Sequence, residues 1–183
     1  MNNMNTVELF EKNRYVHLQD FLDVQSCLEL TNALKELVNQ QQTRKDEQCP
    51  MSEAVHGSMV FDKLLLDLLP HFETASGKKL YPTYSYARIM GSGAYMAKHK
   101  DRPSCQFSLT LCLQDDKQNP YPIFIENYEG TVSSIVLEPG DMIVYHGTQL
   151  YHWREKWFGS EHIQTFCHYV DATGPYMDYK FDG

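Results

Sequence analysis

Apolar and polar residues follow two different periods in the two halves of the chain. Before about residue 76, apolar positions recur at helical spacing, and the clearest stripe begins after Asp23 and ends near Gln41. This stripe consists of Cys27, Leu30, Leu34, Leu37 and Val38. A second run over 61–72 is also helical, and Pro70 near its end predicts a kink or a stop. Residues 6–11 predict a short helix and residues 14–18 a short strand.

From residue 80 onward, short apolar stretches alternate with turn signals such as Pro139-Gly140. The predicted strands are 83–89, 95–99, 105–113, 122–126, 133–137, 142–145 and 162–170. Many short strands with such punctuation predict a sandwich or a barrel rather than βαβ units. The polar segment 39–53 shows no sustained period, so beyond the frayed helix end it is interpreted as an exposed loop.

Two side chains with metal-binding chemistry stand two residues apart, at His99 and Asp101. In an extended chain, side chains at i and i+2 point to the same face, so this pair would project toward one point. A third ligand must come from elsewhere, and His152 in the segment HWRE is the preferred candidate over His146. Two histidines and one carboxylate form the facial triad of non-haem Fe(II) oxygenases, so these residues predict an iron centre.

Length, net charge and cysteine spacing argue against several classes of protein. The length of 183 residues suits one domain, and the formal net charge of −8 argues against nucleic acid as the main partner. Five cysteines without paired spacing indicate free thiols in a reducing, cytoplasmic environment rather than a disulfide framework. No export signal and no apolar run long enough to span a membrane are expected.

With these pieces in place, the chain resembles the 2-oxoglutarate- and Fe(II)-dependent dioxygenases, in particular the prolyl hydroxylase and phytanoyl hydroxylase-like branches. The resemblance rests on HKD at 99–101, EPGD at 138–141, HWRE at 152–155 and HIQTFCHYVD at 162–171. It implies an α+β, mainly β fold: a double-stranded β-helix (jelly-roll, cupin-like) with supporting N-terminal helices. The whole chain, 1–183, would be one domain, with a helical support region at 1–76 and the β-helix core at 77–183.

The resemblance also implies a reaction. His99, Asp101 and His152 would hold Fe(II), with 2-oxoglutarate as cosubstrate, O2 as oxidant and ascorbate as reductant. Such an oxygenase hydroxylates a C–H bond and releases succinate and CO2. The substrate expected from the resemblance is a prolyl or other peptidyl residue, or a small molecule.

One departure from the family pattern concerns the cosubstrate. Family members carry Arg or Lys about ten residues after the distal histidine, where this chain has His162. Strand alternation places His162 and Gln164 on one face, so both are proposed as carboxylate anchors. Tyr86 and Arg88 on the facing strand are their proposed partners, and Arg154 is the alternative cation. Because the usual cation is missing, the chain could instead be an inactive metal-binding β-helix protein that acts as a sensor or interaction module.

Overall fold

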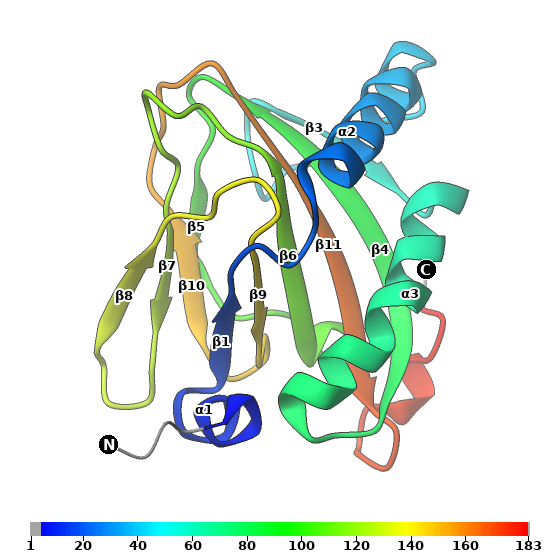
Figure 1. Cartoon of the computed structure of the whole chain (residues 1–183), viewed down its shortest axis with the longest axis vertical. Helices are drawn as coiled ribbons and strands as arrows, with labels where there is room; N and C mark the ends of the chain where they lie inside the picture. Colours follow the sequence, from blue (N-terminus) through cyan, green and yellow to red (C-terminus); the bar gives the residue numbers. More distant parts are fainter. Residues whose placement is uncertain (1–4, 183) are drawn as a thin grey trace.

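The computed structural model describes residues 5–182, whose strands form two antiparallel sheets (Figure 1). The larger sheet contains, in spatial order, β1 (Tyr15–Leu18), β9 (Met142–Tyr145), β6 (Phe107–Gln114), β11 (Glu161–Asp171), β4 (Leu80–Gly91), β3 (Ser52–His56) and β2 (Arg44–Lys45). The smaller sheet contains β5 (Met96–His99), β10 (Tyr151–Arg154), β7 (Ile123–Glu126) and β8 (Val132–Ile135). This is a mainly β, jelly-roll-like architecture, as the spacing of the predicted strands indicates.

Three helices pack against the larger sheet: α1 (Thr6–Asn13), α2 (Val24–Asn39) and α3 (Met59–Ser76) (Figure 1). Short 3-10 turns lie at Pro103–Cys105 and Met177–Tyr179. The start predicted for α2 is confirmed, because the Asp23 side chain accepts a hydrogen bond from the backbone N–H of Ser26. The stop predicted at Pro70 is wrong. Pro70 and Leu66 both lie on the exposed side of α3, so the carbonyl that loses its helical partner there faces water.

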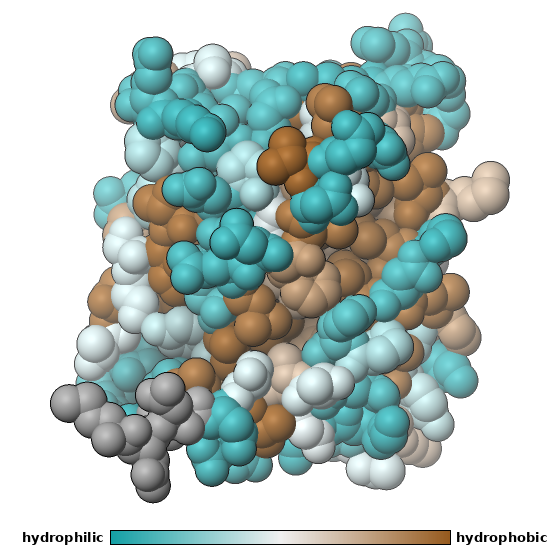
Figure 2. Space-filling view, in the orientation of Figure 1, coloured by the Kyte–Doolittle hydropathy of each residue, from teal (hydrophilic) through white to brown (hydrophobic). Residues whose placement is uncertain are grey.

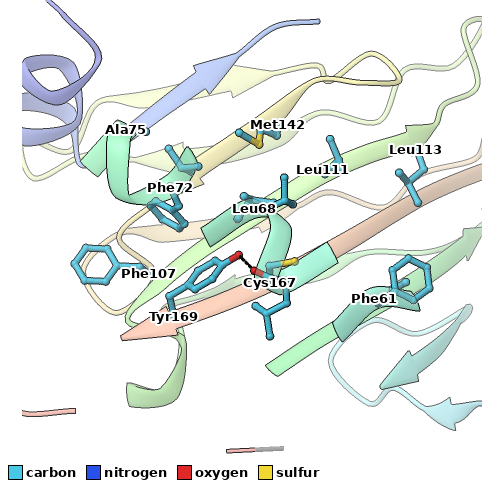
Figure 3. Close-up of a cluster of buried hydrophobic side chains, with 14 of the residues drawn as sticks. Phe61, Leu68, Phe72, Ala75, Phe107, Leu111, Leu113, Met142, Cys167 and Tyr169 are labelled. Atoms are coloured by element: carbon cyan, nitrogen blue, oxygen red, sulfur yellow. Dashed lines mark hydrogen bonds between the residues drawn. The ribbon is translucent and has the colours of Figure 1, made fainter. Parts of the chain in front are cut away.

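The main hydrophobic core lies between the helices and the larger sheet, and Figure 3 shows its aromatic part. Phe72 of α3 packs edge-on against Tyr169 of β11 and Phe107 of β6. The Tyr169 hydroxyl donates a hydrogen bond to the Leu65 carbonyl at 2.8 Å. The predicted alternation of β11 is confirmed on this side, since Ile163, Cys167 and Tyr169 all belong to this core.

The segment predicted as an exposed loop, 39–53, is more ordered than its composition indicates. It contains β2 and the start of β3, and its Cys49 is buried. β3 is a strand because its backbone pairs with β4, from Ser52 opposite Met90 to His56 opposite Tyr86. Such pairing depends on a distant partner and leaves no period in the local sequence.

The cysteines agree with the expectation of free thiols. All five cysteines are buried free thiols. In residues 5–182, none of the helices combines the length and apolarity that crossing a bilayer requires. Figure 2 shows hydrophobic atoms across the middle of one face and hydrophilic residues along its upper end. Exposed apolar side chains of α2 and α3 include Val24, Leu28 and Leu66.

Candidate metal centre

The three predicted ligands converge at one end of the smaller sheet. His99 ends β5, Asp101 follows two residues later, and His152 lies on β10 directly opposite His99 in the antiparallel pairing. One carboxylate oxygen of Asp101, Oδ1, is 3.3 Å from His152 Nε2 and 3.6 Å from His99 Nε2. One ligand atom from each residue lies within 4.8 Å of the other two. Among residues 5–182, this is the only group of His, Cys, Asp or Glu that gathers closely enough to hold an ion.

Backbone carbonyls set the tautomer of both histidines. His99 Nδ1 is 2.8 Å from the Ala97 carbonyl oxygen, and His152 Nδ1 is 3.1 Å from the Leu150 carbonyl oxygen. Because a carbonyl only accepts hydrogen bonds, each Nδ1 carries the proton and donates it. Each Nε2 is left with a lone pair directed at the shared point, which is how histidines in metal sites are oriented.

Asp101 is held as an ionised carboxylate. Its Oδ2 accepts a hydrogen bond from Ser108 Oγ at 2.7 Å, and its backbone N–H donates to the Gly147 carbonyl at 2.9 Å. Burial acts to raise the pKa of Asp101, but the charge of His152 and the hydrogen bonds from His152 and His99, present when their Nε2 atoms carry protons, outweigh it and hold this pKa well below its usual range. A bound cation would act on the carboxylate in the same direction as those protons. Gly147 leaves room for the carboxylate, because a Cβ there would lie 2.3 Å from Asp101 Oδ2.

The hydrogen-bond chain extends to a second buried histidine. Ser108 Oγ is 3.0 Å from His168 Nδ1. Since the Ser108 proton goes to Asp101, His168 Nδ1 donates to the hydroxyl and its buried Nε2 has no partner among the described residues. Neither His168 nor Ser108 is among the site residues predicted from the sequence. The one available signal for Ser108 was its place on the interior face of an alternating strand.

A third residue missed by the sequence pattern, Gln48, contacts His99. Its side-chain nitrogen Nε2 lies 2.7 Å from His99 Nε2, so the amide donates to the lone pair that would bind an ion. Gln48 precedes β3, in a segment without hydrophobic period.

Deeper between the sheets, buried polar atoms lack partners. The described structure gives no hydrogen-bond partner to Arg154 Nη2, the Tyr121 hydroxyl, His162 Nε2 or either polar atom of the Gln164 side chain. The Arg154 guanidinium lies 4.7 Å from the centre of the Tyr121 ring, and this ring is 5.3 Å from that of His162. The Nη1 of Arg154 donates a hydrogen bond to the Tyr121 carbonyl oxygen, and burial lowers the pKa of its guanidinium. A buried polar group normally has a partner, so this buried polar cluster has the chemistry of a polar ligand site.

His162 belongs to this buried polar cluster as a neutral hydrogen-bond acceptor. Its Nδ1 is 2.6 Å from Asp115 Oδ1, so Nδ1 carries the proton and Nε2 offers a lone pair. Burial lowers the pKa of His162 to about 4, despite the hydrogen bond to Asp115. In this form Nε2 cannot donate a hydrogen bond to a carboxylate.

The predicted partners, Tyr86 and Arg88, lie on β4, the strand that pairs with β11. β4 pairs with β11 so that Arg88 lies opposite Gln164, and Tyr86 lies opposite Phe166. Arg88 is only 2% exposed and forms an ion pair with Asp46, and its Nε has no partner in the described structure. The Tyr86 ring stacks on Phe166, with ring centres 4.4 Å apart.

The rival histidine ligand lies elsewhere. His146 packs against the ring of Phe107 at 4.7 Å, on the helix-covered side of the larger sheet, and is not part of the cluster. This agrees with the preference for His152.

No family model matches the sequence, and no curated protein sequence matches it. Solved structures do match its fold. A prolyl-4-hydroxylase of Pseudomonas putida superposes with a TM-score of 0.76 at 11% identity, over 91% of this chain and 97% of that one. HygX of Streptomyces hygroscopicus, with nickel, 2-oxoglutarate and hygromycin B bound, gives 0.73 at 13% identity, over 90% and 86%. A Trichoplax adhaerens prolyl hydroxylase in complex with a hypoxia inducible factor peptide fragment gives 0.72 at 12% identity, over 91% and 87%.

Proposed function

We propose that this chain, which has the fold of 2-oxoglutarate- and Fe(II)-dependent oxygenases, is itself such an enzyme and hydroxylates a C–H bond. The observation that carries the proposal is the convergence of His99, Asp101 and His152 on one point. Fold likeness alone would not suffice, since one fold hosts many functions. We infer further that the two sheets are a double-stranded β-helix, and that residues 1–183 form one domain.

The donor set fits Fe(II). Two imidazoles and one carboxylate suit this ion and leave coordination positions open on the far side. His99 and His152 would bind through Nε2 and Asp101 through Oδ1, while Ala97, Leu150 and Ser108 hold the rings and the carboxylate in position. Iron and 2-oxoglutarate, when bound with O2, supply the oxidising power, with succinate and CO2 as products.

Arg154 is the residue we propose for the far carboxylate of 2-oxoglutarate. It is a buried cation with an unpaired N–H group, whereas His162 presents a lone pair. It also follows the ligand His152 by two residues on the same strand, so both side chains face the interior. The Tyr121 hydroxyl and the Gln164 amide supply further hydrogen-bond donors. In this arrangement Arg154 on β10 would take the role of the Arg or Lys that family members carry where this chain has His162.

The substrate would be a prolyl or other peptidyl residue, or a small molecule, which are the two classes already expected from the resemblance. The buried free thiols support a reducing compartment such as the cytoplasm.

The direct test is aerobic incubation with Fe(II), 2-oxoglutarate and ascorbate, with succinate as the readout. Wild type should release succinate even without substrate, and Asp101→Ala or His152→Ala should not. Arg154→Gln should raise the KM for 2-oxoglutarate about ten- to a hundredfold, the value of one charge-assisted contact. Its metal affinity should stay unchanged, as in the exposed control Lys156→Gln.

The competing function is an inactive metal-binding sensor or interaction module. The contact of Gln48 with His99 Nε2 favours it, because the amide occupies the lone pair that iron would need. Tight zinc binding without any succinate release from wild type would establish this second function and exclude the first.

A further inference from the structure

A second, outer cavity adjoins the candidate metal centre. It has a volume of about 560 Å³ and is lined by Arg44, His56, Gly57, Tyr84, Ser85 and Arg102. Two of these residues, Tyr84 and Arg102, also line a neighbouring cavity of about 390 Å³ that contains His99 and Asp101. The two cavities therefore share a wall formed by Tyr84 and Arg102. The size is that of a small-molecule site.

The wall of this cavity is positively charged in an acidic protein. The chain has a formal net charge of −8, yet the outer cavity has two arginines and no carboxylate among its lining residues. In residues 5–182, no carboxylate lies within 4.0 Å of Arg44. Arg102 has Asp182 at 4.0 Å, and both side chains are largely exposed, so this contact is weak.

The inner cavity does not offset this charge. It adds Lys100 to the basic side chains. Its one lining carboxylate is Asp101, which the proposed metal would use. A further cavity that shares His56 and Tyr84 is lined by Asp46, which pairs with Arg88, and by Glu47. An anion in the outer cavity itself would have two guanidinium groups and no lining carboxylate beside it.

An aromatic wall borders both cavities. Tyr84 lines each of them, and its ring lies near those of His168 at 4.7 Å and Tyr86 at 6.2 Å. The His56 ring stacks on Tyr86, with ring centres 5.0 Å apart. Burial, followed by the charge of Arg44, lowers the pKa of His56, which keeps this ring neutral near pH 7. The Arg102 guanidinium lies over the Tyr84 ring, 4.9 Å from its centre. An aromatic wall beside guanidinium groups suits a molecule with a planar or apolar body and an anionic end.

We propose that the outer cavity binds the primary substrate through an anionic group, a carboxylate or a phosphate, held between Arg44 and Arg102. The body of the substrate then lies along Tyr84 and extends toward His99 and Asp101. That the bound molecule is the substrate rests on the proposed function, whereas the anion site is inferred from the residues that line the cavity. Guanidinium groups bind carboxylates and phosphates in bidentate geometry, which would orient the molecule as well as attract it.

The test uses four small probes of similar size that differ in charge: benzoate, phenyl phosphate, neutral benzamide and cationic benzylamine. Their binding to the full chain is measured by titration calorimetry and by ligand-observed NMR. Benzoate or phenyl phosphate, or both, should bind at least about tenfold more tightly than benzamide, a difference of about 1.4 kcal/mol. A preference between the two anions would identify the group. Equal affinity for the anions and benzamide would overturn the proposal.

Variants distinguish anion binding in the outer cavity from binding at Arg154, the residue proposed for 2-oxoglutarate. Arg44→Gln with Arg102→Gln should abolish the preference for anions, while Arg154→Gln should keep it. The matched control, Lys63→Gln with Lys117→Gln, removes the same charge from exposed positions outside the cavity walls and should keep it too. Survival of the preference in the double arginine variant would overturn the proposal. Succinate release without substrate is measured separately, so failure of the oxygenase function remains distinguishable.

Discussion

His99 and His152 lie directly opposite each other on β5 and β10, and the centres of their rings are 4.3 Å apart. The backbone pairing of two strands therefore sets the distance between the two imidazoles. Asp101 completes the cluster from the loop that follows β5. Strand pairing therefore holds two of the ligands rigidly. The position of the third ligand, Asp101, depends on local hydrogen bonds.

Ser108→Ala should weaken metal binding about tenfold, because Asp101 Oδ2 loses the hydroxyl that orients it. The measurement is a competition titration with Zn(II) or Ni(II) and a chelator of known affinity. Ser134→Ala, at an exposed position of β8, is the control and should leave the affinity unchanged. An unchanged affinity in Ser108→Ala would show that the backbone alone positions Asp101.

Gly147→Ala should disrupt both the fold and the metal site. Its Cβ would lie 2.3 Å from Asp101 Oδ2 and 2.4 Å from the Cys105 carbonyl oxygen, and the backbone atom cannot easily move. A cost of about 1–3 kcal/mol in the free energy of unfolding is expected, together with weaker metal binding. Denaturant unfolding provides the measurement. Gly91→Ala is the control, since its Cβ would meet nothing closer than 3.6 Å; similar losses in both variants would contradict the prediction.

Asp46→Ala should lower the free energy of unfolding by about 3–5 kcal/mol, because it leaves the charge of Arg88 buried without its partner. Adding Arg88→Met should recover much of this loss, since the unpaired charge is then gone. Asp67→Ala breaks the exposed pair with Lys63 and should cost less than about 1 kcal/mol. Equal effects of the two aspartate substitutions would show that burial does not strengthen the Asp46 contact.

Stability should fall on acidification through the range in which unfolded histidines take up protons. Burial lowers the pKa of both His146 and His162 to about 4, below the reference of about 6.5 for an unfolded chain. Between these values the unfolded state binds more protons, so the free energy of unfolding decreases as the pH is lowered. At about pH 4.5 each histidine should contribute a loss on the order of 2 kcal/mol.

Chemical unfolding of the apo protein between about pH 7 and 4.5 measures this dependence. His146→Gln and His162→Gln should each reduce its slope, and together they should reduce it further. His71→Gln, at an exposed position, is the control. A slope that neither variant changes would mean that other groups, such as carboxylates, account for the acid sensitivity.

What the sequence alone determined was local and periodic. The apolar stripe after Asp23 predicted α2, because a helix buries residues at its own spacing. Alternation in β11 separated core residues from the interior-facing His162 and Gln164, because successive side chains point to opposite faces of a sheet. The chemistry of His99, Asp101 and His152 then identified the three residues that meet.

Only the tertiary structure decided which polar groups lie against those residues. Gln48 and Ser108 come from two separate segments, and neither has a local pattern that points to the site. β3 exists because β4 supplies its hydrogen bonds, and Arg154 is buried, with its Nη2 lacking a partner among the described residues, because neighbouring strands remove it from water. Strand pairing and burial depend on residues far apart in the chain, so a period along the sequence cannot encode them.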